Sequence, residues 1–167
     1  MTGRDTRTGP VVIRSHKMGD VSWIVHRHAT LYRDEYGWTP AFEALVAEVA
    51  ADFLKSHDPK REHCWVAERD GAILGSVFLV DAGDGVAKLR LLYVEPSGRG
   101  LGLGRKLVET CIGFARAAGY RRMTLWTNDV LTAARHIYDS LEFELVSESP
   151  HSDFGPPMIG QVLERRL

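Results

Sequence analysis

A glycine-rich segment between a strand pattern and a helix pattern is the part of this sequence best suited to chemistry on a ligand. The segment reads Arg99-Gly100-Leu101-Gly102-Leu103-Gly104-Arg105. Glycine permits a positive φ and lets a ligand approach the backbone closely. The first amides of the following helix have no acceptor within it and lie at the positive end of its dipole. The segment therefore predicts a site for a phosphate or a pyrophosphate.

Two common phosphate motifs do not fit this segment. A P-loop ends in Gly-Lys followed by Ser or Thr, whereas Gly104 is followed by Arg105 and Lys106. A dinucleotide fingerprint has the spacing Gly-x-Gly-x-x-Gly after the first strand of a βαβ unit. Here the spacing is Gly-x-Gly-x-Gly, and the preceding strand belongs to an antiparallel pattern.

The elements that position the segment follow from hydrophobic periodicity and from turn residues. The sequence predicts a strand over 11–14, a helix from 21 that ends at Gly37, and a helix that begins at Thr39-Pro40. Strands follow over 64–68, 73–80 and 87–94, and a helix over 103–118. A strand over 123–127, a helix over 132–141 and strands over 145–149 and 161–165 complete the pattern. The order β-αα-βββ-α-β-α-ββ favours an α+β fold with helices on the faces of a sheet.

Composition narrows the class of protein. The 167 residues include 21 Lys+Arg and 22 Asp+Glu, a formal net charge of -1, which gives no reason to expect a nucleic-acid binder. Two cysteines, Cys64 and Cys111, are too few for a disulfide framework and fit a reducing cytoplasm. Residues 1–10 lack the apolar stretch of a signal peptide, and the apolar segment 72–80 is too short to span a membrane. We expect a flexible segment over 1–10 and one domain over 11–167.

A longer pattern around the glycines resembles a known family. Leu91-Leu92-Tyr93-Val94-Glu95-Pro96, followed by Arg99-x-x-Gly102-x-Gly104 and a helix, closely resembles the acetyl-CoA signature of the GNAT N-acetyltransferase superfamily. The resemblance extends over essentially the whole chain. The segments 25–28, 36–38 and 125–128 also resemble the acetyltransferase half of bacterial proteins that fuse a MarR-type repressor to a GNAT domain.

The resemblance implies a GNAT fold, with a mostly antiparallel mixed sheet flanked by helices, and acetyl-CoA as co-substrate. The pantetheine arm would lie along the strand that ends at Val94, against the backbone of Leu92, Tyr93 and Val94. The Val94 N–H would then donate to the thioester carbonyl as an oxyanion donor. The pyrophosphate would lie on the amides from Arg99 to Arg105, where a Cβ at Gly102 or Gly104 would occupy its place.

A catalytic acid follows from the same resemblance. The family pattern Ala-x-x-x-Tyr-x-x-x-Gly-Phe corresponds here to Ala134, Tyr138, Glu142 and Phe143, so that glutamate replaces the glycine. In the family, this tyrosine protonates or hydrogen-bonds the leaving CoA thiolate. By helical spacing alone, Tyr138 is equally a core residue.

The general base is left open by the sequence. Family members place a glutamate where Thr127-Asn128 or Lys88 stands here, and neither position carries a carboxylate. Glu95, Asp129, His28 and a water chain remain candidates. Deprotonating an amine of pKa about 10.4 at pH 7 costs about 4.6 kcal/mol, against about 1.4 kcal/mol for an α-amino group. The sequence therefore favours an acceptor amine of low pKa.

The acceptor pocket is predicted from residue types and from the family. By the period of two, Lys88, Arg90, Leu92 and Val94 share one strand face, and Arg90 would hold a substrate carboxylate. The alternative for Arg90 is a surface charge paired with an acidic residue. His28, Tyr32 and Trp38, together with residues 151–154, lie where GNAT proteins build acceptor pockets.

The sequence thus predicts a cytoplasmic N-acetyltransferase that acts on a primary amine of a small molecule, such as an amino acid, by direct attack in a ternary complex. We expect no metal, no nucleic acid and no membrane among its partners, and a homodimer is compatible with the sequence. Two alternatives remain, namely a protein or peptide N-acetyltransferase and a non-catalytic module that senses acetyl-CoA.

Overall fold

The computed structural model describes residues 9–167, and most of the expected flexible segment 1–10 lies outside the described residues. The elements, in chain order, are β1 (Val12–Ser15), α1 (Asp20–Tyr36), α2 (Pro40–Ser56), β2 (His63–Arg69), β3 (Ala72–Asp81), β4 (Val86–Val94), a short 3-10 turn (Pro96–Gly98), α3 (Leu103–Ala117), β5 (Arg122–Asn128), α4 (Thr132–Ser140), β6 (Glu144–His151) and β7 (Met158–Arg166). The predicted α+β order is confirmed. The 3-10 turn falls in a stretch for which the sequence predicts only a loop.

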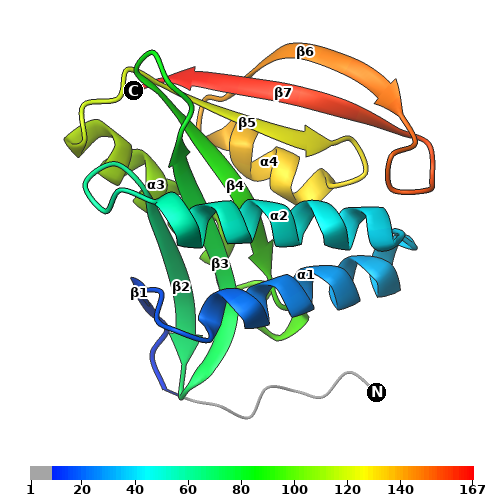
Figure 1. Cartoon of the computed structure of the whole chain (residues 1–167), viewed down its shortest axis with the longest axis horizontal. Coiled ribbons are helices and arrows are strands. Elements are labelled where there is room, and N and C mark those ends of the chain that lie inside the picture. Colours follow the sequence, from blue (N-terminus) through cyan, green and yellow to red (C-terminus); the bar gives the residue numbers. More distant parts are fainter. Residues whose placement is uncertain (1–8) are drawn as a thin grey trace.

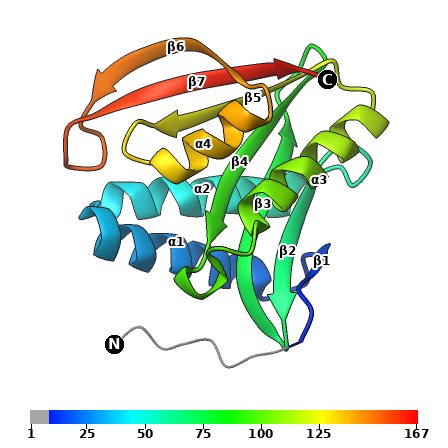
Figure 2. The ribbon, with the colours of Figure 1, turned by 180° about the vertical axis from the view of Figure 1, so that it is seen from behind.

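One sheet organises these elements. Its seven strands lie in the order β1-β2-β3-β4-β5-β7-β6, and among them only β4 and β5 run parallel to each other. Helices α1 and α2 cover one face of the sheet, and α3 and α4 cover the other (Figures 1 and 2). The predicted mostly antiparallel mixed sheet is therefore confirmed. No helix among the described residues is long and apolar enough to cross a membrane.

The helices begin and end where local chemistry requires. Helix α1 follows Gly19, whose φ is 97°, and it ends at Gly37, whose φ is 69°. The Gly37 amide donates to the Arg33 carbonyl at 2.9 Å, and a glycine at this position adopts the left-handed conformation without steric cost. Helix α2 has Pro40 in its first turn, where its missing N–H has no partner to lose.

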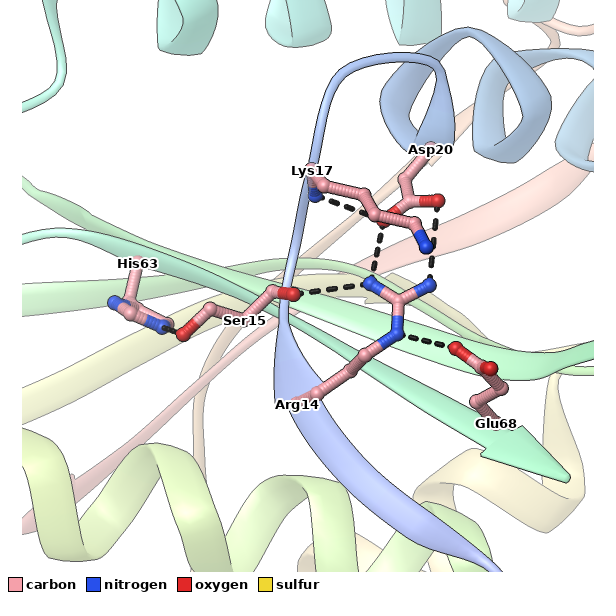
Figure 3. Close-up of polar contacts among 6 residues, drawn as sticks. All are labelled: Arg14, Ser15, Lys17, Asp20, His63 and Glu68. Atoms are coloured by element: carbon pink, nitrogen blue, oxygen red, sulfur yellow. Dashed lines mark hydrogen bonds and ion pairs between the residues drawn. The ribbon is translucent and has the colours of Figure 1, made fainter. Parts of the chain in front are cut away.

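A polar network fixes the start of α1 to the first two strands (Figure 3). Arg14 of β1 contacts Glu68 of β2, and its Nη1 donates to Asp20 Oδ2 at 2.7 Å. The Lys17 amide donates to the same carboxylate at 2.8 Å. Ser15 and His63 lie within hydrogen-bond distance of each other, 2.8 Å, on the same two strands. This network holds α1 against the sheet face that it covers.

Two apolar layers fill the space between the sheet and the helices. The layer under α3 includes Leu107 and Cys111 of the helix with Leu79 and Leu89 of the sheet, all nearly or fully buried. The layer under α1 and α2 includes Ile24, Phe53 and Phe78. Because β3 and β4 contribute to both layers, the position of β4 depends on the packing of both helix pairs.

A pair of glycine substitutions tests how tightly β4 is held. An added Cβ at Gly75 of β3 would lie 2.7 Å from the Tyr93 carbonyl oxygen, so we expect Gly75→Ala to lower the free energy of unfolding by about 1–3 kcal/mol. At Gly113, on the exposed side of α3, an added Cβ meets nothing within 4 Å. Gly113→Ala should therefore raise the free energy of unfolding by about 0.5–1 kcal/mol. Urea unfolding measures both, and a neutral Gly75→Ala would contradict the close approach of the two strands.

Candidate active site

Strands β4 and β5 separate partway along their length. They pair in parallel from Val86 opposite Arg122 to Leu89 opposite Leu125. Beyond that point β5 stays paired with β7 as far as Asn128, while β4 stays paired with β3 as far as Val94. The second half of β4 therefore borders an opening in the sheet.

A bulge in β4 changes which face its side chains occupy. Arg90 pairs with Phe78 and Tyr93 with Ser76, so two residues of β4 oppose one of β3, and Leu91 has a φ of 52°. Ala87 and Leu89 before the bulge, and Leu92 and Val94 after it, all pack in the layer under α3. Lys88 and Arg90 therefore occupy the opposite face, and the expectation that they share a face with Leu92 and Val94 is wrong. The prediction assumed that side chains alternate without interruption along the strand, and a bulge inserts one residue that breaks this alternation.

The bulge leaves the Val94 backbone directed into the opening. The Glu95 amide donates to the Leu74 carbonyl at 2.7 Å, and Val94 pairs with Gly75 one position further along. Antiparallel neighbours alternate between bonded and non-bonded pairs, so the Val94 N–H and C=O point away from β3. They face the side from which β5 has separated.

The glycine-rich segment lies at the end of β4 and leads into α3. Gly100 and Gly102 have φ values of 79° and 70°, which favour glycine. The first helical hydrogen bond is from the Lys106 amide to the Gly102 carbonyl at 3.1 Å. The amides of Leu103, Gly104 and Arg105 thus have no acceptor within α3, which is the arrangement that suits a bound anion.

The two glycines expected to leave room for a phosphate differ in their surroundings. An added Cβ at Gly102 would meet nothing within 4 Å, so space for a ligand exists there. At Gly104 the Cβ would lie 2.7 Å from Ile137 Cδ1 and 3.7 Å from Val94 Cγ2. Gly104 therefore lies where α3 packs closely against α4 and β4, and an added Cβ would force the end of the Ile137 side chain to shift. The sequence does not show this reason for glycine.

The two arginines of this segment already have protein partners. Arg99 Nη2 lies 2.5 Å from Glu35 Oε1 of α1. Arg105 donates to Glu109 Oε1 and to Ser140 Oγ, both at 2.8 Å. Both arginines are about half exposed, so these ion pairs are weak and open to exchange for a phosphate.

A cavity of about 840 Å³ connects the glycine-rich segment with the space between α1, α2 and the separated strands. It brings together almost every site residue predicted from the sequence, namely His28, Tyr32, Trp38, Arg90, Leu92, Tyr93, Val94, Arg99, Gly100, Gly102, Leu103, Gly104, Arg105, Asn128, Phe154 and Tyr138. Leu101 is exposed and does not line the cavity.

Aromatic rings form the wall of the cavity on the side of α1 and α2. Tyr32 packs on Trp38 and Phe42 with ring centroids 5.0 and 5.1 Å apart, and Phe154 of the β6–β7 loop packs on Trp38 at 5.1 Å. The Thr39 amide donates to the Phe154 carbonyl at 3.0 Å, which holds this loop against the start of α2. The wall is therefore largely apolar and is built from α1, the α1–α2 connection, α2 and the β6–β7 loop.

His28 lies within this wall as a buried, neutral ring. Its Nδ1 is 2.9 Å from the Ile24 carbonyl oxygen, which can only accept, so Nδ1 carries the proton. Its Nε2 is buried and has no hydrogen-bond partner among the described residues. The ring stacks on Tyr32 and contacts Tyr93, with centroids 5.8 and 4.8 Å away. Burial lowers the pKa of His28 to about 4, which makes it a poor base for an ammonium group.

Tyr138 lies on the opposite side of the cavity, on α4. It is 4% exposed, and its ring packs edge-on against Phe143 at 5.7 Å. Burial raises the pKa of Tyr138, so its phenol stays protonated at neutral pH and its hydroxyl can donate a hydrogen bond. Glu142, which stands where the family pattern has glycine, has a φ of 67°, and this explains why glycine suits that turn.

The two carboxylates considered as bases lie elsewhere. Glu95 accepts two hydrogen bonds from Arg27, at 2.6 and 2.8 Å, and Asp129 Oδ1 accepts from the Ile159 amide at 2.9 Å. Neither lines the cavity. Their observed roles are an ion pair and the closure of a turn.

Two contacts at the end of β5 are not evident in the sequence. Asn128 Oδ1 lies 2.6 Å from His151 Nε2, which fixes the proton of this ring on Nε2. The Trp126 indole fills the space above Gly160, where an added Cβ would be 2.9 Å from Nε1. The partners are more than 20 residues apart in each case, so no local pattern could have revealed them.

Comparisons with known proteins identify the family. Residues 25–143 match the model of the acetyltransferase (GNAT) family. The chain is 31% identical over 122 residues to an N-acetyltransferase of Schizosaccharomyces pombe, covering 72% of this chain and 75% of that protein. It is 31% identical over 126 residues to the N-acetylaspartate synthetase of Danio rerio, covering 75% of this chain but 43% of that protein. The chain spans about half the length of several curated relatives.

The fold has close counterparts among solved structures. An acetyltransferase from Salmonella typhimurium, solved with its cofactor acetyl-CoA, superposes with a TM-score of 0.73 at 22% identity, covering 95% of this chain and 94% of that chain. The fold and site define an acyltransferase with acetyl-CoA as co-substrate. The chain belongs to the acetyltransferase (GNAT) family. The finer resemblance to the acetyltransferase half of MarR–GNAT fusions stays a prediction.

Replacement of His28 tests the buried neutral ring. The pKa of histidine is about 6.5 in the unfolded chain and about 4 here, so the unfolded state binds more protons between these values. The free energy of unfolding should fall as the pH drops below about 6.5, and His28 accounts for up to roughly 3 kcal/mol of that fall. We expect His28→Phe to lose less stability than the unsubstituted protein between about pH 7 and about pH 4.5, measured by urea unfolding.

Tyr32→Phe is the control because it changes the neighbouring ring and retains His28. It should show the full loss of stability on acidification. Equal losses in His28→Phe and in the unsubstituted protein would contradict a neutral His28.

Proposed function

We propose that this protein transfers acetyl from acetyl-CoA to the primary amine of a small molecule, an amino acid or another carboxylated amine, by direct attack in a ternary complex. The observation that carries this proposal is the continuous cavity. It joins the start of α3 and the unpaired backbone of β4 to an aromatic chamber that Lys88 and Arg90 also line. One ligand can therefore enter from the glycine-rich segment while a second occupies the chamber.

The proposed roles follow from these positions. The pantetheine arm pairs with Leu92, Tyr93 and Val94, and the pyrophosphate lies on the amides from Arg99 to Arg105. The amine attacks the thioester carbonyl, and the Val94 N–H stabilises the charge that develops on the oxygen. The C–S bond then breaks as the amine nitrogen loses its proton to water, and the Tyr138 hydroxyl donates its proton to the leaving thiolate and regains one from solvent.

Two features favour a small acceptor with a low pKa. Four cations line the cavity, Lys88, Arg90, Arg99 and Arg105, against the two carboxylates Glu35 and Asp153, whereas a groove for lysine-bearing peptides would be acidic. Glu95 and Asp129 do not line the cavity, and the carboxylates that do are Glu35, which pairs with Arg99, and Asp153, which lies beside His151. Deprotonation is therefore easiest for an amine of low pKa, such as an α-amino group. A relative named N-acetylaspartate synthetase supports an acceptor that bears carboxylates.

The proposal includes a cytoplasmic location and no binding of nucleic acid. Both described cysteines, Cys64 and Cys111, are free and buried, which fits a reducing compartment. A homodimer is the assembly that the sequence allows.

The activity is tested by release of the CoA thiol in the presence of a panel of amines and amino acids. We expect thiol release with at least one α-amino acid. In Gly102→Glu we expect the acetyl-CoA affinity to be at least about tenfold weaker, because a carboxylate would stand at the phosphate position. Gly83→Glu is the matched control: Gly83 has a φ of 84°, has equally open surroundings and lies in the β3–β4 turn. Thiol release with peptides alone would indicate a protein acetyltransferase. Binding of acetyl-CoA with no release across the panel would indicate a sensing module.

The role of Tyr138 is tested by Tyr138→Phe. We expect kcat to fall about 10–100-fold with little change in acetyl-CoA affinity, because the phenol acts only on the leaving group and solvent replaces it slowly. Tyr120→Phe is the control, since the Tyr120 hydroxyl donates to the Arg61 carbonyl at 2.8 Å and does not line the cavity. An unchanged kcat in Tyr138→Phe would assign this residue to the core alone.

A further inference from the structure

Two neighbouring cations of β4, Lys88 and Arg90, line the cavity. Lys88 and Arg90 lie two residues apart on β4, just before the bulge at Leu91, so their side chains project from the same face. Both are half-buried and line the cavity. Burial lowers the pKa of Lys88 and of Arg90, since each charge is partly removed from water.

Neither cation has a carboxylate partner within the described part of the chain. Arg14, Arg27 and Arg61 each form an ion pair at 3.0 Å or less. Lys88 and Arg90 form none within 4 Å, and no side-chain hydrogen bond joins them to a described residue. Asp52 and Glu48 of α2 act on Arg90 only through longer-range electrostatics. Two neighbouring like charges, both partly desolvated and unpaired, are unfavourable unless a ligand compensates them.

We propose that the acceptor is a small amine with two anionic groups, and that Arg90 and Lys88 bind one group each. This inference rests on the proposed function and specifies the acceptor of the same site. Arg90 is the nearer of the two to Val94, where acyl transfer is proposed, so it binds the carboxylate closer to the amine. Lys88 lies one step further along the strand and binds the second anionic group.

The geometry fits two anionic groups better than one. The guanidinium of Arg90 presents a planar fork that both oxygens of one carboxylate satisfy, which leaves the Lys88 ammonium without a counterion. Alternate residues of a strand lie about 7 Å apart, a spacing that the two flexible side chains reduce to the separation of the carboxylates in an acidic amino acid. A dianion neutralises both charges, whereas a monoanion leaves one partly buried charge uncompensated.

The experiment compares acids with their amides. Aspartate and glutamate are assayed against asparagine and glutamine by release of the CoA thiol, and binding of the same four compounds is measured by calorimetry. We expect at least one acid to have a kcat/KM at least about tenfold above that of its amide, a preference typical of one charged contact. Lys88→Gln should reduce that preference to about one, through a higher KM for the acid and an unchanged KM for the amide. Arg90→Gln should raise the KM of both.

Control variants separate this contact from a general change in charge. Lys55→Gln and Arg33→Gln remove an exposed cation from α2 and α1, and neither residue lines the cavity. Both should retain the preference for the acid. Acetyl-CoA affinity should be unchanged in all four variants, which verifies that they fold.

The outcomes distinguish this inference from the proposed function. Thiol release with the amides as fast as with the acids, or a preference that persists in Lys88→Gln, overturns the two-anion acceptor and leaves the proposed transferase activity intact. Selective binding of an acid that is lost in Lys88→Gln, without any thiol release, supports the anion site and overturns the transferase. Absence of both binding and release for all four compounds overturns the anion site.

Discussion

The separation of β4 from β5 beyond Leu89 is the constraint on which the site depends. A strand in the middle of a sheet normally satisfies its backbone groups on both sides, and leaving them unpaired is costly. Here the first half of β4 is paired on both sides and the second half only with β3. β4 stays paired with β3, and β5 stays paired with β7, so these two pairings hold β4 and β5 apart. The opening therefore depends on strands on both sides of it.

The bulge at Leu91 lets β4 direct charged side chains towards α2 and apolar side chains of its second half towards α3 and α4. Before the bulge, the side chains of Lys88 and Arg90 point towards α2. After it, Leu92 and Val94 pack towards α3 and α4, while Tyr93 turns towards His28. Without the extra residue, the cations and the apolar contacts of the second half would lie on the same face. The strain of a non-glycine residue at positive φ is the local cost of this change of face.

The sequence predicts the fold well because its signals are local. Gly37 and Pro40 mark the boundary between the first two helices, and Asp70-Gly71 marks the β2–β3 turn with φ values of 49° and 79°. The glycine-rich segment likewise predicts its own place at the start of α3. The chamber is harder to predict, because its walls combine residues that are far apart in the chain. The bulge, the packing of Gly104 on Ile137 and the contact of Asn128 with His151 depend on tertiary neighbours, so no window of sequence contains them.

The single parallel pair in the sheet has a consequence for where a ligand can bind. Antiparallel strands can be joined by a two-residue hairpin, but parallel strands need a crossover that carries the chain back to the starting edge, usually through a helix. The chain from β4 to β5 makes this return through α3. The first turn of that helix must therefore stand at the carboxyl end of β4, beside the opening. Topology alone thus places a positive helix terminus beside the opening between β4 and β5, before any side chain has contributed.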